Sequence, residues 1–153
     1  MKSWIVASCL AAVLVGSQES APRGRPDLAG RWAADPALGD REPIVPICNR
    51  ECVITQTTDT ILVRSAQGVV ITYKFDGSAT HPPPREGGAP PTTLTFRTNW
   101  KGDVLVIDST AGKYKTTARL SLAAGRLTIE GERPYYTPQP TFKQTYRKVV
   151  EKF

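Results

Sequence analysis

The sequence predicts an all-β domain in which eight or nine antiparallel strands form a small barrel. After residue 27, apolar residues alternate with polar ones in short stretches, and no apolar period of 3.6 continues over three helical turns. Turn-forming residues separate the stretches, as in a chain of hairpins. Such a meander leaves two exposed edges unless the sheet curls, and about eight strands is a common size for closure. An open sandwich is the alternative, although long sheet-to-sheet crossings are not evident.

The chain divides into three parts. Residues 1–17 combine a positive start, an apolar run and small residues before a cleavage point, which is typical of a signal peptide. The run is too short to cross the ~30 Å hydrocarbon core, and no later segment comes close. A lipoprotein box ending at Cys9 is a weaker alternative, because the apolar run continues beyond it. Residues 18–27 form a polar, flexible leader, and residues 28–153 form the barrel domain. We therefore expect a secreted or periplasmic protein without a membrane span.

Nine candidate strands follow the leader, and each shows the two-residue alternation of a half-buried strand. Turns such as Thr58-Asp59, Lys101-Gly102-Asp103 and Ala123-Ala124-Gly125 join most of them tightly. The candidate strands are residues 28–32, 52–57, 60–64, 68–75, 92–100, 104–108, 115–122, 126–130 and 142–149.

Cys48 and Cys52 are the only cysteines that remain once the signal peptide is removed. An exported pair without a competitor most simply forms one structural disulfide, which requires the three intervening residues to turn. The loop is short, so the entropic stabilisation is about 2 kcal/mol. Redox activity and metal binding are alternatives, but the usual redox signature has two intervening residues and a metal would lack two ligands.

One connection, residues 76–91, is too long for a tight turn and contains five prolines and three glycines. Connections of this length are uncommon in compact domains and are often functional. Two interpretations remain: a lid over the barrel mouth and a solvated insertion. His81, the single histidine, lies here, and an exposed histidine beside prolines is more typical of a spacer than of a catalyst.

The stretch Asp27-Leu28-Ala29-Gly30-Arg31-Trp32 resembles the Gly-x-Trp opening of lipocalin and calycin barrels. Residues 142–149 and the internal pieces 73–77, 99–107, 120–122 and 125–129 also resemble small secreted bacterial lipocalin-like proteins. In lipocalins the tryptophan plugs one barrel end beneath an arginine from a late strand. The resemblance assigns these structural places to Trp32 and Arg147, a contact that contributes about 0.5 to 2 kcal/mol.

Catalytic chemistry is not expected. The sequence contains no Gly-x-Ser-x-Gly elbow, no phosphate-binding loop and no paired histidine ligands, so we predict no enzyme activity, no metal site and no cofactor. The formal charge is +6, but the basic residues are scattered among acidic ones without interleaved aromatics. Nucleic acid is therefore not an expected partner.

Two non-enzymatic functions remain. The first is binding of a small apolar or amphipathic ligand inside the barrel, for which the candidate lining residues are Tyr73, Phe75, Phe96 and Trp100. The second is recognition of an extracytoplasmic protein, for example as an inhibitor of an extracellular enzyme. Its candidate contacts are Tyr135 and Tyr136 together with the proline-rich loop, because tyrosine is favoured at interface anchors.

Overall fold

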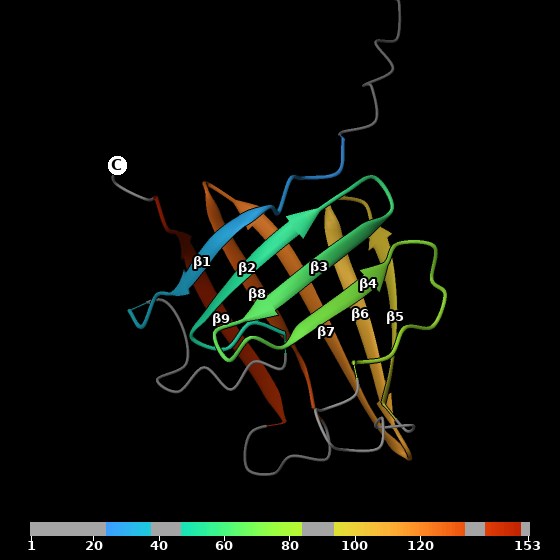
Figure 1. Cartoon of the computed structure of the whole chain (residues 1–153). Helices are drawn as coiled ribbons and strands as arrows, with labels where there is room; N and C mark the ends of the chain where they lie inside the picture. The colour runs from blue at the N-terminus through green and yellow to red at the C-terminus, as the bar shows by residue number, and fades with distance from the viewer. Residues whose placement is uncertain (1–23, 38–46, 84–93, 134–139, 151–153) are drawn as a thin grey trace, which may run out of the picture.

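The computed structural model describes residues 24–37, 47–83, 94–133 and 140–150, which form one antiparallel sheet curled into a nearly closed barrel (Figure 1). The described residues contain nine strands and no helix, which confirms the predicted fold class. The strands are β1 (Gly30–Ala34), β2 (Glu51–Gln56), β3 (Thr60–Ser65), β4 (Val70–Lys74), β5 (Leu94–Lys101), β6 (Val104–Ala111), β7 (Tyr114–Ala123), β8 (Arg126–Glu132) and β9 (Thr141–Lys148).

The ends of the meander pair with each other. The hydrogen-bonded order is β4-β3-β2-β1-β9-β8-β7-β6-β5, so the first and last strands are neighbours within the sheet. Trp32 of β1 lies opposite Lys148 of β9, and Ala34 lies opposite Tyr146. Because β1 and β9 pair with each other, the two edges of the sheet are those of β4 and β5. In Figure 1, β1 (blue) and β9 (red) lie side by side accordingly.

Tight turns hold several of the other neighbours in register. Between β2 and β3 the Thr57 amide donates to the Thr60 carbonyl at 2.9 Å, which closes the predicted Thr58-Asp59 turn. Between β7 and β8, Ala124 and Gly125 both have positive φ, 50° and 70°. Two consecutive left-handed residues are typical of a type I′ turn, whose twist matches that of the flanking strands. The local sequence therefore sets these hairpins directly.

The first strand begins two residues later than predicted. Leu28 is buried, and its amide donates to Gln56 Oε1 at 2.9 Å instead of joining a strand ladder. Its carbonyl accepts a 2.9 Å hydrogen bond from Trp32 Nε1. The Pro26 carbonyl also accepts from Gln56 Nε2 at 3.1 Å, so the end of the predicted leader contacts the barrel. These hydrogen bonds hold residues 26–29 against the barrel, and we call this segment the plug.

The barrel interior is filled mainly by apolar side chains that alternate inward along each strand. Burial patterns such as that of β8, in which every second residue is buried, follow the two-residue period of a strand. Among the described residues, the largest fully buried side chains come from all around the barrel: Trp32, Tyr73, Tyr146, Leu28, Ile54, Ile61, Leu105, Ile107, Leu120, Leu127, Ile129 and Gln144.

Cys48 and Cys52 form the predicted disulfide, with their Cα atoms 5.3 Å apart. Both residues are buried. The chain bends at Asn49 and Arg50 between them, and Glu51, which was also expected in the turn, already begins β2. The Tyr146 hydroxyl donates to the carbonyls of Cys48 and Asn49, the latter at 3.0 Å. The disulfide loop is thereby tied to β9 as well as to its own strand β2.

The barrel has one discontinuity, between β4 and β5, which we call the seam. The two strands are not hydrogen-bonded neighbours, although they lie side by side in Figure 1. The described part of the proline-rich connection, residues 76–83, contacts β5 here: Thr80 and Phe96 exchange two backbone hydrogen bonds of 2.8 and 2.9 Å. This part of the connection therefore helps to close the seam. The rest of the connection, 84–91, lies outside the described residues.

Candidate functional site

The four aromatic residues predicted to line a ligand site meet at the seam. Tyr73 and Phe75 come from the β4 side, and Phe96 and Trp100 come from β5. Tyr73 packs edge-to-face on Phe96 with ring centroids 5.1 Å apart, and Phe75 packs similarly on Trp100 at 5.6 Å. Each pair contributes about 0.5 to 1.5 kcal/mol beyond its buried area. Rings therefore join the two strands where the backbone ladder is missing.

Polar side chains accompany these rings, and the sequence interpretation missed them. Thr98 lies between Phe96 and Trp100 on the same face of β5 and is 1% exposed. Within the described part of the chain, Tyr73 Oη, Thr98 Oγ1 and Trp100 Nε1 are buried and have no hydrogen-bond partner, and Thr80 Oγ1 is in the same situation. The alternation around Phe96 could have identified Thr98 as inward-facing. The lack of a partner is visible only in three dimensions.

Two buried tyrosines differ in how their hydroxyl groups are satisfied. Burial raises the pKa of both Tyr73 and Tyr146 above the usual value, because an ionised phenol loses its hydration in the core. The Tyr146 hydroxyl donates to two carbonyls of the disulfide loop, whereas the Tyr73 hydroxyl has no partner. Tyr146 therefore has a structural role, and Tyr73 is a neutral hydroxyl directed into the barrel.

The predicted contact between Trp32 and Arg147 is replaced by a contact with the next residue. Lys148 Nζ lies 5.7 Å from the centroid of the Trp32 ring, while Arg147 is exposed and pairs with Ala33. Trp32 and Lys148 are register partners and so share a face, which places Arg147 on the other one. A Cβ on Gly30 would lie 2.5 Å from Lys148 Cε, so the glycine makes room for the lysine stem.

One hollow beside the disulfide loop has a lining of apolar and polar residues, two of which belong to the core. It has a volume of about 230 Å³ and is lined by Ile47, Asn49, Val63, Ser65, Gln67, Val69 and Ile71. Ile47 and Val63 are also members of the hydrophobic core. The hollow therefore lies between the β3–β4 turn and the disulfide loop, where core side chains come close to the surface.

A second hollow, of about 520 Å³, lies near the plug. Its lining residues are Arg25, Thr58, Asp59, Thr60, Lys74, Phe75 and Asp76. The Arg25 guanidinium lies 5.7 Å from the centroid of the Phe75 ring. Ser78 lowers the pKa of Asp76 by hydrogen bonding, since its amide donates to Asp76 Oδ1 at 2.8 Å. One ring of the seam, Phe75, therefore borders this more polar hollow.

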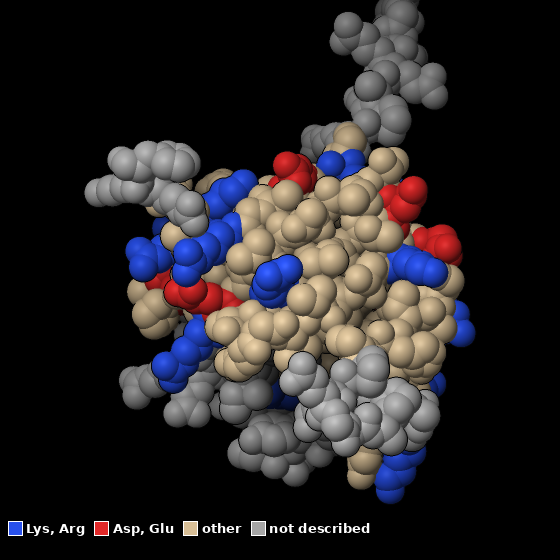
Figure 2. Space-filling view, viewed as in Figure 1, with Lys and Arg blue, Asp and Glu red and all other residues tan. Residues whose placement is uncertain are grey.

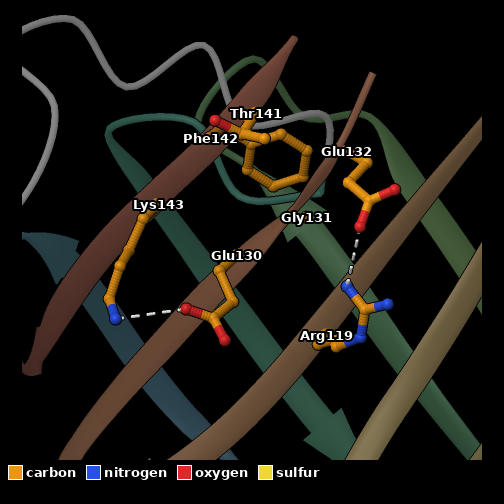
Figure 3. Close-up of a pocket in the computed structure, with 7 residues that line it drawn as sticks. All are labelled: Arg119, Glu130, Gly131, Glu132, Thr141, Phe142 and Lys143. Carbon is orange, nitrogen blue, oxygen red and sulfur yellow. Dashed lines mark ion pairs between the residues drawn. The ribbon is translucent and has the colours of Figure 1, made fainter. Parts of the chain in front are cut away.

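A third hollow, of about 330 Å³, lies over β7, β8 and β9 (Figure 3). Glu130 points toward Lys143 at 3.1 Å, and Glu132 points toward Arg119 at 3.9 Å. These charged groups are largely exposed, and exposed ion pairs contribute about 0 to 1 kcal/mol. The pairing gives this surface a mixed charge without an obvious ligand preference.

The other predicted features lie at the margin of the seam or outside the described residues. His81 Nδ1 donates to the Leu94 carbonyl at 3.1 Å and is exposed. Tyr135 and Tyr136 lie outside the described residues, as does the predicted signal peptide. In the ranges that the structure describes, no group of three His, Cys, Asp or Glu side chains could hold a metal ion.

Charged side chains are mixed on the face formed by β1 to β4 (Figure 2). Most of that face is uncharged, and Lys and Arg lie beside Asp and Glu around its margin. For example, Arg31 and Glu51 form a 3.1 Å ion pair across β1 and β2. Among the described residues, no helix is long and apolar enough to cross a membrane.

Comparison with known proteins identifies a class of fold, an antiparallel β-barrel that this chain shares with solved structures. The structure of the fluorescent protein UnaG matches with a TM-score of 0.55 at 13% sequence identity, over 80% of this chain and 97% of UnaG. Human cRBP IV matches with a TM-score of 0.52 at 16% identity, over 81% of this chain and 99% of that protein. At such identities the likeness shows the fold alone and does not identify a bacterial or exported subgroup. No protein-family model and no curated protein sequence matches significantly.

Proposed function

We propose that this chain is an exported, non-enzymatic barrel that binds a small apolar or amphipathic ligand in its interior. The observation that carries the proposal is the aromatic seam. Four large rings from two segments on either side of the proline-rich connection meet inside the barrel, at the one place where the described strands lack a backbone ladder. A binding site for an apolar ligand needs apolar surface that can rearrange to admit the ligand. Strands joined mainly by side chains separate more easily than strands joined by a backbone hydrogen-bond ladder.

Two further features support this function. Core residues Ile47 and Val63 border the hollow beside the disulfide loop, which offers apolar surface near the outside. The disulfide itself fits an oxidising compartment, because such bonds are rare in the cytosol. The fold is one in which a small interior holds either side chains or one small ligand.

Titration with N-phenyl-1-naphthylamine, an uncharged apolar dye, tests ligand binding. We expect saturable fluorescence enhancement with one dye per chain. Phe96→Leu removes a seam ring while keeping the site apolar and should weaken binding about tenfold, since an aromatic pair is worth about 0.5 to 1.5 kcal/mol. Tyr114→Leu is the matched control, because Tyr114 is an exposed ring on β7. Linear, non-saturating fluorescence would contradict the proposal.

Expression of the full chain in a bacterium, followed by cell fractionation, tests export. We expect the protein in the periplasm or medium with residues 1–17 removed and the Cys48–Cys52 bond intact. Intact mass of the purified protein measures both features. Recovery of the uncleaved chain in the cytosol, with two free thiols at Cys48 and Cys52, would overturn the exported assignment without affecting the dye titration.

A further inference from the structure

Buried polar atoms without a partner gather at the seam. Tyr73 is 0% exposed and Thr98 is 1% exposed, and neither hydroxyl has a hydrogen-bond partner among the described residues. Trp100 Nε1 and Thr80 Oγ1 share this state. The other two such atoms among the described residues are Ser78 Oγ, in the connection after β4, and Gln144 Oε1, on β9 outside the seam. These seam atoms come from β4, from β5 and from the connection between them. Because these unpartnered polar atoms gather at the seam, we look for a cause that is specific to the seam.

The energetic cost of such atoms is high. Leaving a buried donor or acceptor without a partner costs about 1 to 3 kcal/mol, and native proteins keep few of them. Two comparable buried groups elsewhere in the barrel are paired: the Tyr146 hydroxyl bonds two carbonyls, and Trp32 Nε1 bonds the Leu28 carbonyl. The two aromatic residues at the seam that carry a polar atom, Tyr73 and Trp100, thus differ from their counterparts at the barrel end. A bound molecule that supplies the missing partner explains the difference.

The chemistry of the seam atoms defines that partner. The indole N–H of Trp100 can only donate, so it requires an acceptor. Burial raises the pKa of Tyr73, which keeps its hydroxyl protonated and able to donate. Thr98 can donate or accept. The nearby cations are all exposed: Arg97 donates to the Gly77 carbonyl at 3.0 Å, Lys74 lies on the outer face of β4, and Arg25 lies 5.7 Å from the centroid of the Phe75 ring. The buried donors Tyr73, Thr98 and Trp100 are neutral, so they favour an uncharged oxygen over a carboxylate, whose burial would be costly.

The rings define the rest of the ligand. The Tyr73–Phe96 and Phe75–Trp100 pairs meet at interplanar angles of 70° and 67°, and Thr98 lies between the two β5 rings. Faces and edges of aromatic rings pack best against flat, polarisable groups. We propose that the seam binds a planar aromatic or conjugated molecule whose uncharged carbonyl oxygen accepts hydrogen bonds from Tyr73, Thr98 and Trp100. This inference rests on the proposed ligand-binding function and specifies the class of ligand.

Two uncharged dyes of similar size test the inference. 6-Propionyl-2-dimethylaminonaphthalene carries a ketone, and N-phenyl-1-naphthylamine has no carbonyl. Both are titrated against the full purified protein and its variants. We expect the ketone dye to bind wild type about tenfold more tightly than the other dye. Its emission should also shift as expected for a hydrogen-bonded carbonyl.

The variants separate hydrogen bonding from packing. Tyr73→Phe and Thr98→Val each keep the shape of the side chain and should weaken the ketone dye about three- to tenfold, while leaving the other dye within twofold. Thr72→Val is the matched control, because Thr72 is exposed on the opposite face of β4. It should change neither affinity.

Three results would overturn the inference, and they differ from failure of the proposed function. Equal affinities of the two dyes in wild type, equal losses for both dyes in Tyr73→Phe, or no loss for the ketone dye in both seam variants would each refute a carbonyl site while leaving apolar binding intact. Failure of both dyes to bind wild type would overturn the proposed function together with the inference.

Discussion

The barrel is enclosed in two different ways. Eight neighbouring strand pairs, from β4 through β1 and β9 to β5, are joined by backbone ladders, and we call them the wall. The seam has two backbone hydrogen bonds between Thr80 and Phe96 and two aromatic pairs that join β5 to Tyr73 and Phe75. In the wall, hydroxyl groups such as that of Tyr146 are paired, whereas Tyr73 at the seam is not. The comparison indicates that the continuous backbone ladders lie in the wall, whereas the proposed binding site lies at the seam.

The largest effect is expected from Gly131→Ala in the wall. A Cβ there would lie 1.9 Å from the Thr117 carbonyl oxygen on the neighbouring strand, so the β7–β8 ladder must shift. We expect a loss of about 3 kcal/mol in the free energy of unfolding, measured by chemical denaturation. Thr128→Ala, at a partly buried position on the same strand, is the control and should lose less than about 1 kcal/mol. A loss in Gly131→Ala no larger than in the control would show that the ladder adapts.

Hydrogen exchange compares the two regions directly. The amides of Thr80 and Phe96 are held by the isolated pair at the seam, and opening it does not require the ladders of the wall to break. We expect these two amides to exchange about 100-fold faster than the central ladder amides of β7 and β8, a difference of about 2.7 kcal/mol. Equal protection would mean that seam and wall open together and that the comparison is wrong.

Alkaline pH should destabilise both regions. Burial raises the pKa of Tyr73 and of Tyr146, so above pH 10 the unfolded chain releases phenolic protons that the folded chain retains. The associated stability is fully present below pH 10 and is lost as pH rises beyond it, by up to about 1.4 kcal/mol per pH unit for each tyrosine. Tyr73→Phe and Tyr146→Phe should each reduce the slope by about half. A slope that neither variant changes would contradict the expected burial.

At neutral pH the same two substitutions should differ. Tyr146→Phe removes the donor shared by Cys48 and Asn49 and should cost about 1 kcal/mol. Tyr73→Phe removes an unpartnered hydroxyl and should leave stability within about 0.5 kcal/mol of wild type or raise it. Thermal unfolding of the ligand-free proteins measures both. Equal losses would show that the Tyr73 hydroxyl is paired in solution.

The smallest effect concerns a turn of the wall. Ala124 has a φ of 50°, a conformation that alanine disfavours and asparagine tolerates better. Ala124→Asn should therefore raise the free energy of unfolding by about 0.5 kcal/mol without affecting dye binding. Ala123→Asn, in the last position of β7, is the control and should not stabilise the protein. If both variants stabilise equally, turn geometry is not the reason.

The local sequence was sufficient to predict most strands and turns of the wall. Alternation predicted all nine strands because each buries one face, and turn residues such as Thr58-Asp59 and Ala124-Gly125 placed their ends. The alternation pattern failed at residues 28 and 29, which it had assigned to the first strand. The Leu28 amide and carbonyl are hydrogen-bonded to the side chains of Gln56 and Trp32, so they are not part of a strand ladder. The contact over Trp32 was assigned one residue too early, since the register that places Lys148 opposite Trp32 follows from strand pairing.

By itself, the sequence predicted the all-β class, the nine strands and the four aromatic residues that meet at the seam, because each depends on local alternation. It also predicted the Cys48–Cys52 disulfide, because the predicted signal peptide contains the third cysteine. Tertiary structure decided where the sheet joins and where it does not. It paired β1 with β9 and left the discontinuity at the proline-rich connection. It also decided which hydroxyl groups find partners, since Tyr73 and Tyr146 look alike in sequence and differ only in the groups that the folded chain brings to them.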